Sequence, residues 1–444
     1  MAISLLITCG RLLDPSQRLD KIGDLLIAEN KIAQLGDKGS IPSQGVPVLD
    51  ATGMVVCPGF IDLHCHLREP GFEEKETIAT GTRAAAKGGF TTVCCMPNTN
   101  PPLDNQAAID YVKSKAHTEG VVNVFPVGCI TKSRKGEELA EMKELAQAGV
   151  IGFSDDGNPV MNSRIMRHAL DCSSSLGLVV IDHCEDKALT SGGLMNEGSV
   201  ATRLGLKGMP AAAEEIMVAR DLALAQLTGA RLHIAHVSTE GSADLIRRAK
   251  DKGIAVTAEV TPHHLILTQE RVIGKQPSSA YDTNAKVNPP LRTEKDINAL
   301  ITGLKERVID AIATDHAPHT LVDKMCEFGL AAFGISGLET AFGCLMTLVH
   351  DGKLELTTLV SKLTIEPAQI TGSKFSELGT LKIDSQADIT LFDPNKEWIV
   401  DINEFTSKGK NSPFNGYQFK GKVMVTIVGG KIAYRDDSIK VGKK

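Results

Sequence analysis

The sequence of 444 residues has few aromatic side chains and no long apolar run, and both features limit the classes of function to be expected. Aromatic residues make up 4% of the chain and the formal net charge is −6. A basic stripe interleaved with aromatics is missing, so nucleic acid is not an expected partner. No stretch approaches the roughly 18 consecutive apolar residues of a membrane-spanning helix, so no membrane span is expected. The first residues, MAISLLITCGRLLDP, lack a basic segment and indicate a strand and a turn rather than a signal peptide.

The ten cysteines form no CxxC pair and follow no regular spacing. Cys94 and Cys95 are adjacent, while Cys65 and Cys184 each neighbour a histidine. In a chain of this size the pattern is typical of a cytoplasmic protein whose thiols are reduced and mostly buried. A cysteine-based zinc site is not expected.

Eight apolar runs rich in β-branched residues alternate with helical patterns in the middle of the chain. The runs are MVVCPGFIDLHC, FTTVCCMPN, VVNVFPVGC, VIGFSDD, LGLVVIDHC, ARLHIAHVS, GIAVTAEVT and VIDAIATDHAP. Near-continuous apolar strands separated by helices indicate a parallel sheet covered on both faces. Eight such units over roughly 300 residues predict an α/β fold with a closed (β/α)8 barrel of the TIM type, and a doubly wound open sheet is the alternative.

Both ends of the chain differ from the middle. Residues 1–57 and 375–444 contain short strands and tight turns, as in LLIAENKIAQLG and VMVTIVGGKIAYRD. The most economical arrangement folds the two ends together as one small β-sandwich, beside a barrel formed by residues 58–374.

Polar residues gather at the predicted carboxyl ends of the barrel strands, where proteins of this fold carry their chemistry. Residues i and i+2 of a strand point to the same face, so His64 and His66 in FIDLHCHLREPG converge, with Arg68 next in the alternation. An isolated pair of this kind could equally be two solvated histidines. The other strand ends carry Asn98, Asp155, Asp156, His183, His236, Asp315, His316 and His319.

Five of these residues combine imidazole groups with one hard carboxylate, a set that suits a borderline divalent ion such as zinc. They are His64, His66, His183, His236 and Asp315. One tetrahedral ion cannot use them all, so a carboxylate of the fourth strand, Asp155 or Asp156, could bridge two ions. Such a pair of ions generates a hydroxide and polarises a carbonyl. Each histidine alone could be an ordinary packed residue, and it is their conjunction that favours a metal site.

The other histidines have simpler interpretations. Surface positions in helical patterns are expected for His117, His168 and His350. His233 lies three residues before His236, so only one of the two can face the barrel interior. His263 and His264 end the seventh strand, where packing or hydrogen bonding is the simpler expectation.

Several motifs occur in a recognisable order: DLHCHLREPG, MPNT, SDDG, DHCE, IAHVS, NPPLR, TDHAPH and FGISGLET. They resemble the bacterial type I dihydroorotases of the amidohydrolase superfamily over nearly the whole chain, and GTLKIDSQADITLFDP resembles the return into the superfamily's β-sandwich. HxH is shared by many amidohydrolases, whereas NPPLR together with TDHAPH is far more specific. The resemblance implies an enzyme of de novo pyrimidine (UMP) biosynthesis that reversibly hydrolyses (S)-dihydroorotate to N-carbamoyl-L-aspartate.

The resemblance also implies two zinc ions per subunit. The more buried ion would be held by His64, His66 and Asp315, and the other by His183 and His236. Asp156 rather than Asp155 would bridge both, since its distance from His183 fits the family's spacing. A metal-bridging hydroxide would attack the ring amide carbonyl, with Asp315 as general base and then general acid.

Substrate contacts are implied for His66, Arg68, Asn98, Asn288, His319, Phe333 and Gly334. Arg68, Asn98 and His319 would bind the substrate's carboxylate, and the planar guanidinium suits two parallel charge-assisted hydrogen bonds. Asn288 and the backbone at Phe333 and Gly334 would read the imide edge of the ring. Residues 317–337, with four glycines or prolines and mixed polarity, are interpreted as a lid, with an ordinary loop as the alternative.

Two other functions are weighed against this one. Hydantoinases and allantoinases use a carboxylated lysine of the fourth strand to bridge their metals, but here that strand reads VIGFSDDG. A non-catalytic dihydroorotase-like partner of aspartate transcarbamoylase would lack several ligands, which this chain retains. The ligand set would also accept cobalt or manganese. We expect a homodimer, while an association with aspartate transcarbamoylase is left open.

Overall fold

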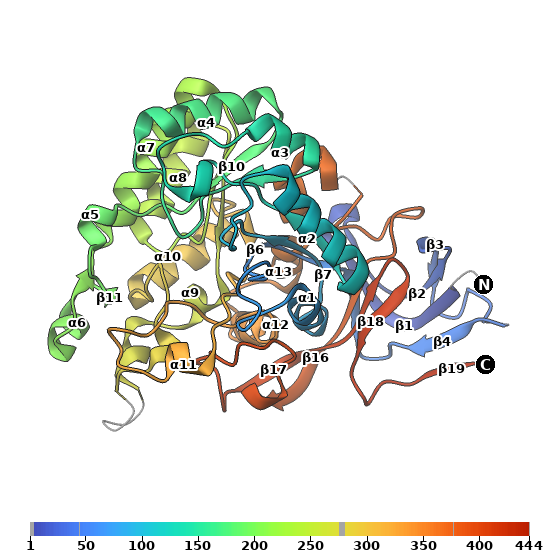
Figure 1. The fold of residues 1–444 in the computed structure, drawn as a ribbon. Coiled ribbons are helices and arrows are strands. Elements are labelled where there is room, and N and C mark those ends of the chain that lie inside the picture. The colour runs from blue at the N-terminus through green and yellow to red at the C-terminus, as the bar shows by residue number, and fades with distance from the viewer. Residues whose placement is uncertain (1–3, 44, 275–279, 376, 444) are drawn as a thin grey trace.

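The computed structural model describes residues 4–43, 45–274, 280–375 and 377–443. Within these residues, eight strands of the middle region run parallel to their neighbours and match the eight apolar runs one by one (Figure 1). They are β6 (Phe60–Cys65), β7 (Phe90–Cys95), β8 (Asn123–Pro126), β9 (Gly152–Phe153), β10 (Val179–Asp182), β13 (Leu232–Ile234), β14 (Val256–Val260) and β15 (Ala311–Ile312). Every residue of β6 and β7 is buried, as expected for strands covered on both faces.

The eight strands close into a barrel at two seams. Regular ladders join β6, β7 and β8, and separately β9, β10, β13, β14 and β15. Just after β8, Gly128 forms a single parallel bridge with Phe153, and just after β15, His316 forms one with Cys65. These bridges complete the ring, so the predicted (β/α)8 barrel is confirmed and the open doubly wound sheet is excluded.

A buried aspartate strengthens each seam. Asp62 accepts hydrogen bonds from Thr314 N at 2.8 Å and Thr314 Oγ1 at 2.6 Å. Asp155 accepts from Ile130 N at 2.9 Å and Thr131 N at 3.0 Å, and also from the Thr131 hydroxyl. These carboxylates take up backbone donors that the interrupted ladders leave without strand partners. Asp155 therefore has a structural role at the wall of the barrel.

Helices cover the outside of the barrel (Figure 1). The longer ones are α1 (Ile78–Lys87), α2 (Gln106–Glu119), α3 (Met142–Ala148), α4 (Ser163–Ser175), α7 (Ala212–Thr228), α8 (Glu240–Asp251), α10 (Glu294–Lys305), α12 (Ala341–His350) and α13 (Leu356–Leu363). Shorter ones are α5 (Lys187–Thr190), α6 (Ser199–Leu204), α9 (Pro262–Ile266), α11 (Leu321–Lys324) and α14 (Ile365–Ile370). Their starts are encoded locally: Thr293 and Asp296 form a capping box that opens α10.

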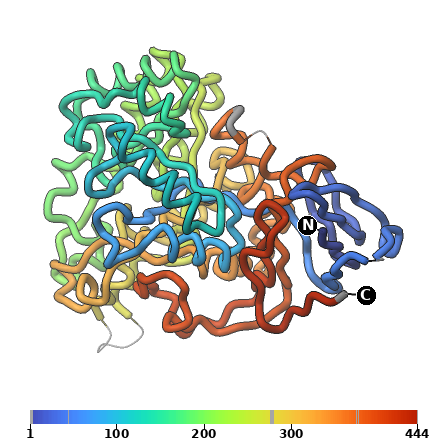
Figure 2. Tube along the Cα trace, turned by 45° about the vertical axis from the view of Figure 1, so that its right-hand side comes forward, coloured from blue at the N-terminus to red at the C-terminus, as the bar shows by residue number. Residues whose placement is uncertain are grey.

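Strands from both chain ends lie together beside the barrel, the N-terminal ones in blue and the C-terminal ones in red (Figure 2). The N-terminal strands are β1 (Ser4–Asp14), β2 (Leu19–Ala28), β3 (Lys31–Asp37), β4 (Pro47–Asp50) and β5 (Val55–Pro58). The C-terminal strands are β16 (Ile389–Ile399), β17 (Gln418–Val428), β18 (Lys431–Arg435) and β19 (Val441–Lys443). They are hydrogen-bonded into one nine-stranded sheet, in which β5 pairs with both β1 and β16. Its core mixes both ends, as Ile7 and Leu25 share a cluster with Leu391 and Val425.

One predicted strand is wrong in its extent. The run MVVCPGFIDLHC forms two strands, β5 in the terminal sheet and β6 in the barrel, with Gly59 between them. A Cβ atom at Gly59 would overlap the side chain of Thr91, so only glycine fits where the chain passes from one sheet to the other. The division into domains 1–57 with 375–444 and 58–374 stays a prediction.

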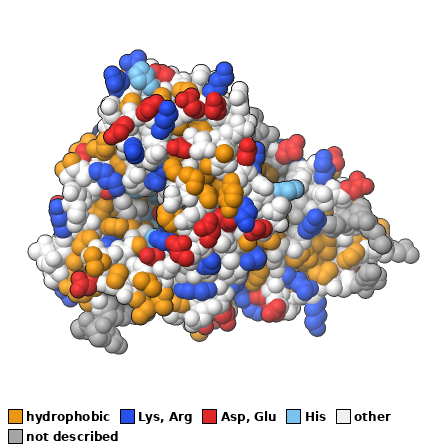
Figure 3. Space-filling model, viewed as in Figure 1, with side chains coloured by type: hydrophobic (Ala, Val, Ile, Leu, Met, Phe, Trp, Pro, Cys, Tyr) orange, Lys and Arg blue, Asp and Glu red, His pale blue; other side chains and the backbone are white. Residues whose placement is uncertain are grey.

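The structure also bears on the predictions made for the cysteines and for membrane spans. All ten cysteines are free and seven of them are buried, which confirms the prediction of mostly buried thiols. Among the described residues, none of the helices combines the length and apolar composition of a membrane span. A strand pair, β11 (Met195–Asn196) and β12 (Gly208–Met209), lies in the loop after β10. On the face shown in Figure 3, acidic and basic side chains are interspersed rather than separated by sign.

Candidate active site

One cavity of about 540 Å³ opens at the carboxyl ends of the barrel strands. Every residue singled out in the sequence as a ligand or substrate contact lines it, except His64. His64 is fully buried, with an exposed fraction of 0%, and lies behind the others. The lining residues among them are His66, Arg68, Asn98, Asp156, His183, His236, Asn288, Asp315, His319, Phe333 and Gly334.

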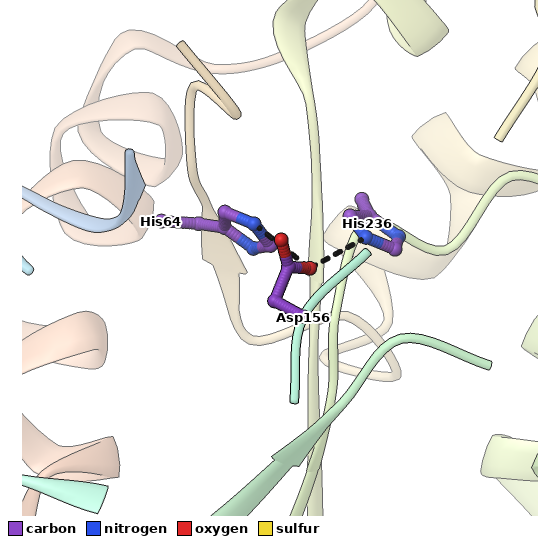
Figure 4. A group of neighbouring side chains, drawn as sticks. All are labelled: His64, Asp156 and His236. Carbon is purple, nitrogen blue, oxygen red and sulfur yellow. Dashed lines mark ion pairs between the residues drawn. The ribbon is translucent and has the colours of Figure 1, made fainter. Parts of the chain in front are cut away.

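Asp156 lies at the centre of four histidines. Its Oδ1 is 3.3 Å from His64 Nε2, 3.6 Å from His236 Nε2 and 3.8 Å from His183 Nδ1. Its Oδ2 is 3.6 Å from His66 Nε2. Figure 4 shows the carboxylate between His64 and His236. Burial would raise the pKa of Asp156, but the nearby imidazoles, His64 first and then His236, bring it well below its usual range.

Asp315 lies beside the first histidine pair, His64 and His66. Its Oδ1 is 3.0 Å from His66 Nε2 and 3.7 Å from His64 Nε2. Burial would raise the pKa of Asp315, yet the contacts with His66 and the nearby imidazole of His64 hold it below its ordinary value. The cluster thus contains two candidate metal groups, His64 with Asp156 and His236, and His64 with His66 and Asp315.

The outer nitrogens of three histidines are already engaged. His64 Nδ1 donates to Glu259 Oε1 at 2.8 Å, His66 Nδ1 donates to Asn98 Oδ1 at 2.8 Å, and His183 Nε2 donates to Glu185 Oε2 at 2.9 Å. A neutral ring with its proton on the outer nitrogen presents a lone pair inward. Such outer partners orient metal-binding histidines.

The buried atoms of the described cluster without a hydrogen-bond partner include His64 Nε2 and Asp156 Oδ1, which lie 3.3 Å apart. A lone pair on the ring facing a carboxylate oxygen places two acceptors opposite each other, which is costly in a buried site. A divalent cation between them would satisfy both atoms. Imidazole and carboxylate are also the ligand types that zinc takes. The residues present therefore fit a metal centre.

Arg68 and His319 lie together at one side of the cavity. Arg68 Nη2 is 3.3 Å from His319 Nε2, and Arg68 Nε donates to Pro318 O at 3.2 Å. His319 Nε2 donates to Phe333 O at 2.8 Å. Burial lowers the pKa of Arg68 to about 10, so the guanidinium stays charged at neutral pH. This corner can bind an anion.

Asn98 and Asn288, the two side-chain amides predicted to contact the substrate, already bond other residues of the site. Asn98 Oδ1 is occupied by His66, so only its amino group is left to reach a substrate. Asn288 Nδ2 donates to Glu185 Oε2 at 3.0 Å, which leaves its carbonyl oxygen for a ligand. Both residues support the histidines as well as line the cavity.

Sequence reasoning missed Glu259 and Glu185. Glu259 accepts from His64 and also from His233 Nε2 at 3.1 Å, so His233 belongs to the wall while His236 faces the cavity, as predicted. The available signals were a glutamate inside the apolar strand VTAEV and one two residues after His183. His264, which lies in α9, bonds Thr261 Oγ1 and Pro289 O, which agrees with a hydrogen-bonding role.

Comparisons with known proteins agree with this geometry. A family model described as "Dihydro-orotase-like" matches residues 53–242. The chain is 52% identical to a dihydroorotase of Geobacter sp. (strain M21) over 433 residues, covering 98% of this chain and 100% of that one. This chain belongs to the dihydroorotase family. A dihydroorotase of Thermoanaerobacter sp. (strain X514) is 54% identical over 415 residues, covering 93% of this chain and 94% of that one.

Solved structures share the fold. The L-hydantoinase (dihydropyrimidinase) of Arthrobacter aurescens superposes with a TM-score of 0.86 at 25% identity, covering 100% of this chain and 98% of that one. The dihydropyrimidinase of Brevibacillus agri NCHU1002 gives 0.85 at 24% identity, with 99% and 97% covered. The chain is thus a cyclic-amide hydrolase with the barrel and sheet of these enzymes.

Among the described residues that line the cavity, no lysine occupies the centre of the histidine cluster. The one lysine of that lining is Lys187, whose Nζ pairs with Glu185 Oε2 at 2.6 Å. Asp156 occupies the central position between the histidines instead. The carboxylated lysine that we associate with hydantoinases therefore has no counterpart in this lining.

Two buried lysines attach the loop 317–337, which is interpreted as a lid, to the preceding segment 283–286. Lys286 Nζ donates to Phe328 O at 2.6 Å, and Lys324 Nζ donates to Ala332 O at 2.7 Å and Thr283 O at 3.0 Å. The segment 317–337 includes α11 and contributes His319, Phe333 and Gly334 to the cavity. Its opening and closing stay a prediction.

Proposed function

We propose that this dihydroorotase interconverts (S)-dihydroorotate and N-carbamoyl-L-aspartate in pyrimidine biosynthesis. The observation that carries the proposal is the position of Asp156 and Asp315 among four histidines, next to the anion-binding corner of Arg68 and His319. A cyclic substrate with a carboxylate would bring its amide to the first group and its charge to the second.

The same geometry supports two metal sites as part of the proposal. One divalent ion would be held by His64, His66 and Asp315, a second by His183 and His236, and Asp156 would contact both. When bound, two Zn²⁺ ions would lower the pKa of a water molecule and polarise the amide carbonyl. Imidazole and carboxylate ligands would equally take cobalt or manganese.

The chain's own residues would position the substrate and move its protons. Asp315 would accept the proton of the attacking water and return it to the leaving ring nitrogen, and the reverse transfer would close the ring. Arg68 and His319, with the amino group of Asn98, would hold the carboxylate. Asn288 and the backbone at Phe333 and Gly334 would contact the imide edge.

The proposal is tested by following the hydrolysis of dihydroorotate in the ultraviolet beside hydantoin and allantoin. We expect turnover of dihydroorotate alone, about two divalent ions per chain, and loss of activity after treatment with a strong chelator. An active preparation without metal would contradict the metal centre, and a preference for hydantoin would contradict the substrate.

Arg68→Met is expected to raise the KM for dihydroorotate about a hundredfold, since the substrate carboxylate would lose a charge-assisted partner and stay desolvated. Metal content should not change, because Arg68 contacts His319 and Pro318 rather than the histidine cluster. Steady-state kinetics and metal analysis of the variant check both points. A normal KM would contradict the prediction and indicate that Arg68 has a structural role instead.

The assembly state and location are further parts of the proposal. We propose a homodimer in the cytoplasm, with the free thiols of the chain as support for the location. A physical association with aspartate transcarbamoylase is a further proposal. Light scattering of the chain alone and with that enzyme tests both assemblies.

A further inference from the structure

Asn411 connects the two ends of the loop 317–337 from a distant part of the chain. It lies in the segment between β16 and β17 and is buried, with an exposed fraction of 3%. Its Nδ2 donates to Ala317 O and to Gly334 O, both at 3.0 Å. Its Oδ1 accepts from His319 N at 2.9 Å and from Ser336 Oγ at 2.8 Å.

These four contacts use the full hydrogen-bonding capacity of the amide, two donors and two acceptor positions. The orientation of the amide is fixed by its partners, because two carbonyl oxygens need the amino group and a backbone N–H needs the oxygen. The backbone of Asn411 adds a fifth bond by accepting from Ser336 N at 2.8 Å. The side chain of Asn411 thus joins the two ends of the loop 317–337.

Three of the four tied residues, Ala317, His319 and Gly334, line the cavity. His319 approaches Arg68, and Gly334 follows Phe333, whose carbonyl His319 contacts. The surroundings are tight, since a Cβ atom on Gly409 would lie 2.6 Å from Ser336 Oγ. A shift of Asn411 would therefore change the spacing between His319 and Gly334 rather than be absorbed by empty space.

We propose that Asn411 is a positioning residue for substrate selection, which sets the distance between the anion-binding corner and the backbone that contacts the ring. It acts through His319 and Gly334 and touches neither the substrate nor the histidine cluster. The proposal rests on the function proposed above. It gives the C-terminal segment a part in a binding site otherwise built by the barrel.

The test uses Asn411→Asp, which keeps the shape but turns a second acceptor toward Ala317 O and Gly334 O. We expect the KM for dihydroorotate to rise about tenfold or more while kcat changes less than about threefold, because substrate placement rather than chemistry is disturbed. The preference for dihydroorotate over dihydrouracil, the same ring without the carboxylate, should shrink by a similar factor. Metal content should be unchanged, and hydrogen exchange in peptides covering 317–337 should accelerate.

Asn415→Ala is the matched control, since Asn415 is an exposed asparagine of the same segment whose side chain accepts only from Ile402 N. It should match the unmutated chain in every measurement. Where Asn411→Asp fails to fold, Ser336→Ala removes a single bond to the amide and should move KM and the substrate preference in the same direction. An unchanged KM and preference in a folded variant with lowered thermal stability would overturn the inference. Absence of dihydroorotate turnover in the unmutated chain would instead overturn the proposed function.

Discussion

Asp156→Ala is expected to lose nearly all turnover, on the order of 10³-fold or more, together with bound metal. Among the described residues, this carboxylate alone lies within 4 Å of all four histidines. Two dications held close together repel strongly unless an anion lies between them. The ion held by His183 and His236 should leave first, because the site of His64 and His66 keeps Asp315. Metal analysis and turnover measure both effects.

Asp155→Ala is the matched control for this prediction. Asp155 has the same chemistry one residue earlier, but its carboxylate bonds Ile130 N and Thr131 N at the barrel seam. Its removal should keep both ions and leave turnover largely intact, while the unsatisfied seam donors lower the free energy of unfolding by about 1–3 kcal/mol. Thermal unfolding detects that loss. An inactive Asp155 variant beside an active Asp156 variant would reverse the assignment.

Bicarbonate provides a second check on the same position. An aspartate supplies the bridging anion without any modification, whereas a carboxylated lysine depends on dissolved carbon dioxide. Recovery of metal and activity by the stripped chain should therefore be equal with and without added bicarbonate. A requirement for bicarbonate would indicate a carboxylated lysine and contradict the role of Asp156.

The barrel could be predicted because its signal is local. Eight apolar runs with helices between them fix the order of strands, and the rule that chemistry lies at the carboxyl ends of the strands then places His64, Asp156 and Asp315 at one rim. The break at Gly59 could not be read in this way, because β5 and β6 form one continuous apolar run in the sequence. The break is seen in the folded chain, where β5 and β6 pair with different strands and Thr91 packs against Gly59.

Two of the residues that sequence reasoning missed share a physical cause. Glu259 and Asn411 act through partners that lie far away in the chain, and no periodicity marks such partners, whereas Glu185 bonds His183 only two residues away. Glu259 bonds His64 across the barrel, 195 residues earlier. Asn98 illustrates the converse, because a motif placed it at the site but could not show that its oxygen is already bonded to His66. Motifs locate a site, whereas its hydrogen-bond network requires coordinates.

Asp315→Asn is expected to reduce turnover in both directions by roughly 10²–10⁴-fold, the range of a lost general acid–base group. Asparagine keeps the size of the side chain and can still face His66, but it cannot accept a proton from water. Because the pKa of Asp315 lies below its ordinary value, the carboxylate is ionised throughout the neutral range. Ring opening uses this ionised form and also needs the attacking water to lose a proton, so hydrolysis should gain toward alkaline pH.

Ring closure needs the opposite form of Asp315, with its proton in place. At a pH far above the pKa of Asp315, its protonated fraction rises tenfold for each unit by which the pH falls. The rate of cyclisation should therefore rise toward acidic pH, and the rate of hydrolysis toward alkaline pH, between about pH 6 and 9. Rates of both reactions in the unmutated chain and in Asp315→Asn test this, and the variant should lose the opposed trends. Asp436→Asn is the control, since Asp436 pairs with Lys422 in the terminal sheet at 2.7 Å, and it should keep both pH profiles. Parallel pH trends for the two directions in the unmutated chain would contradict a shared acid and base at Asp315.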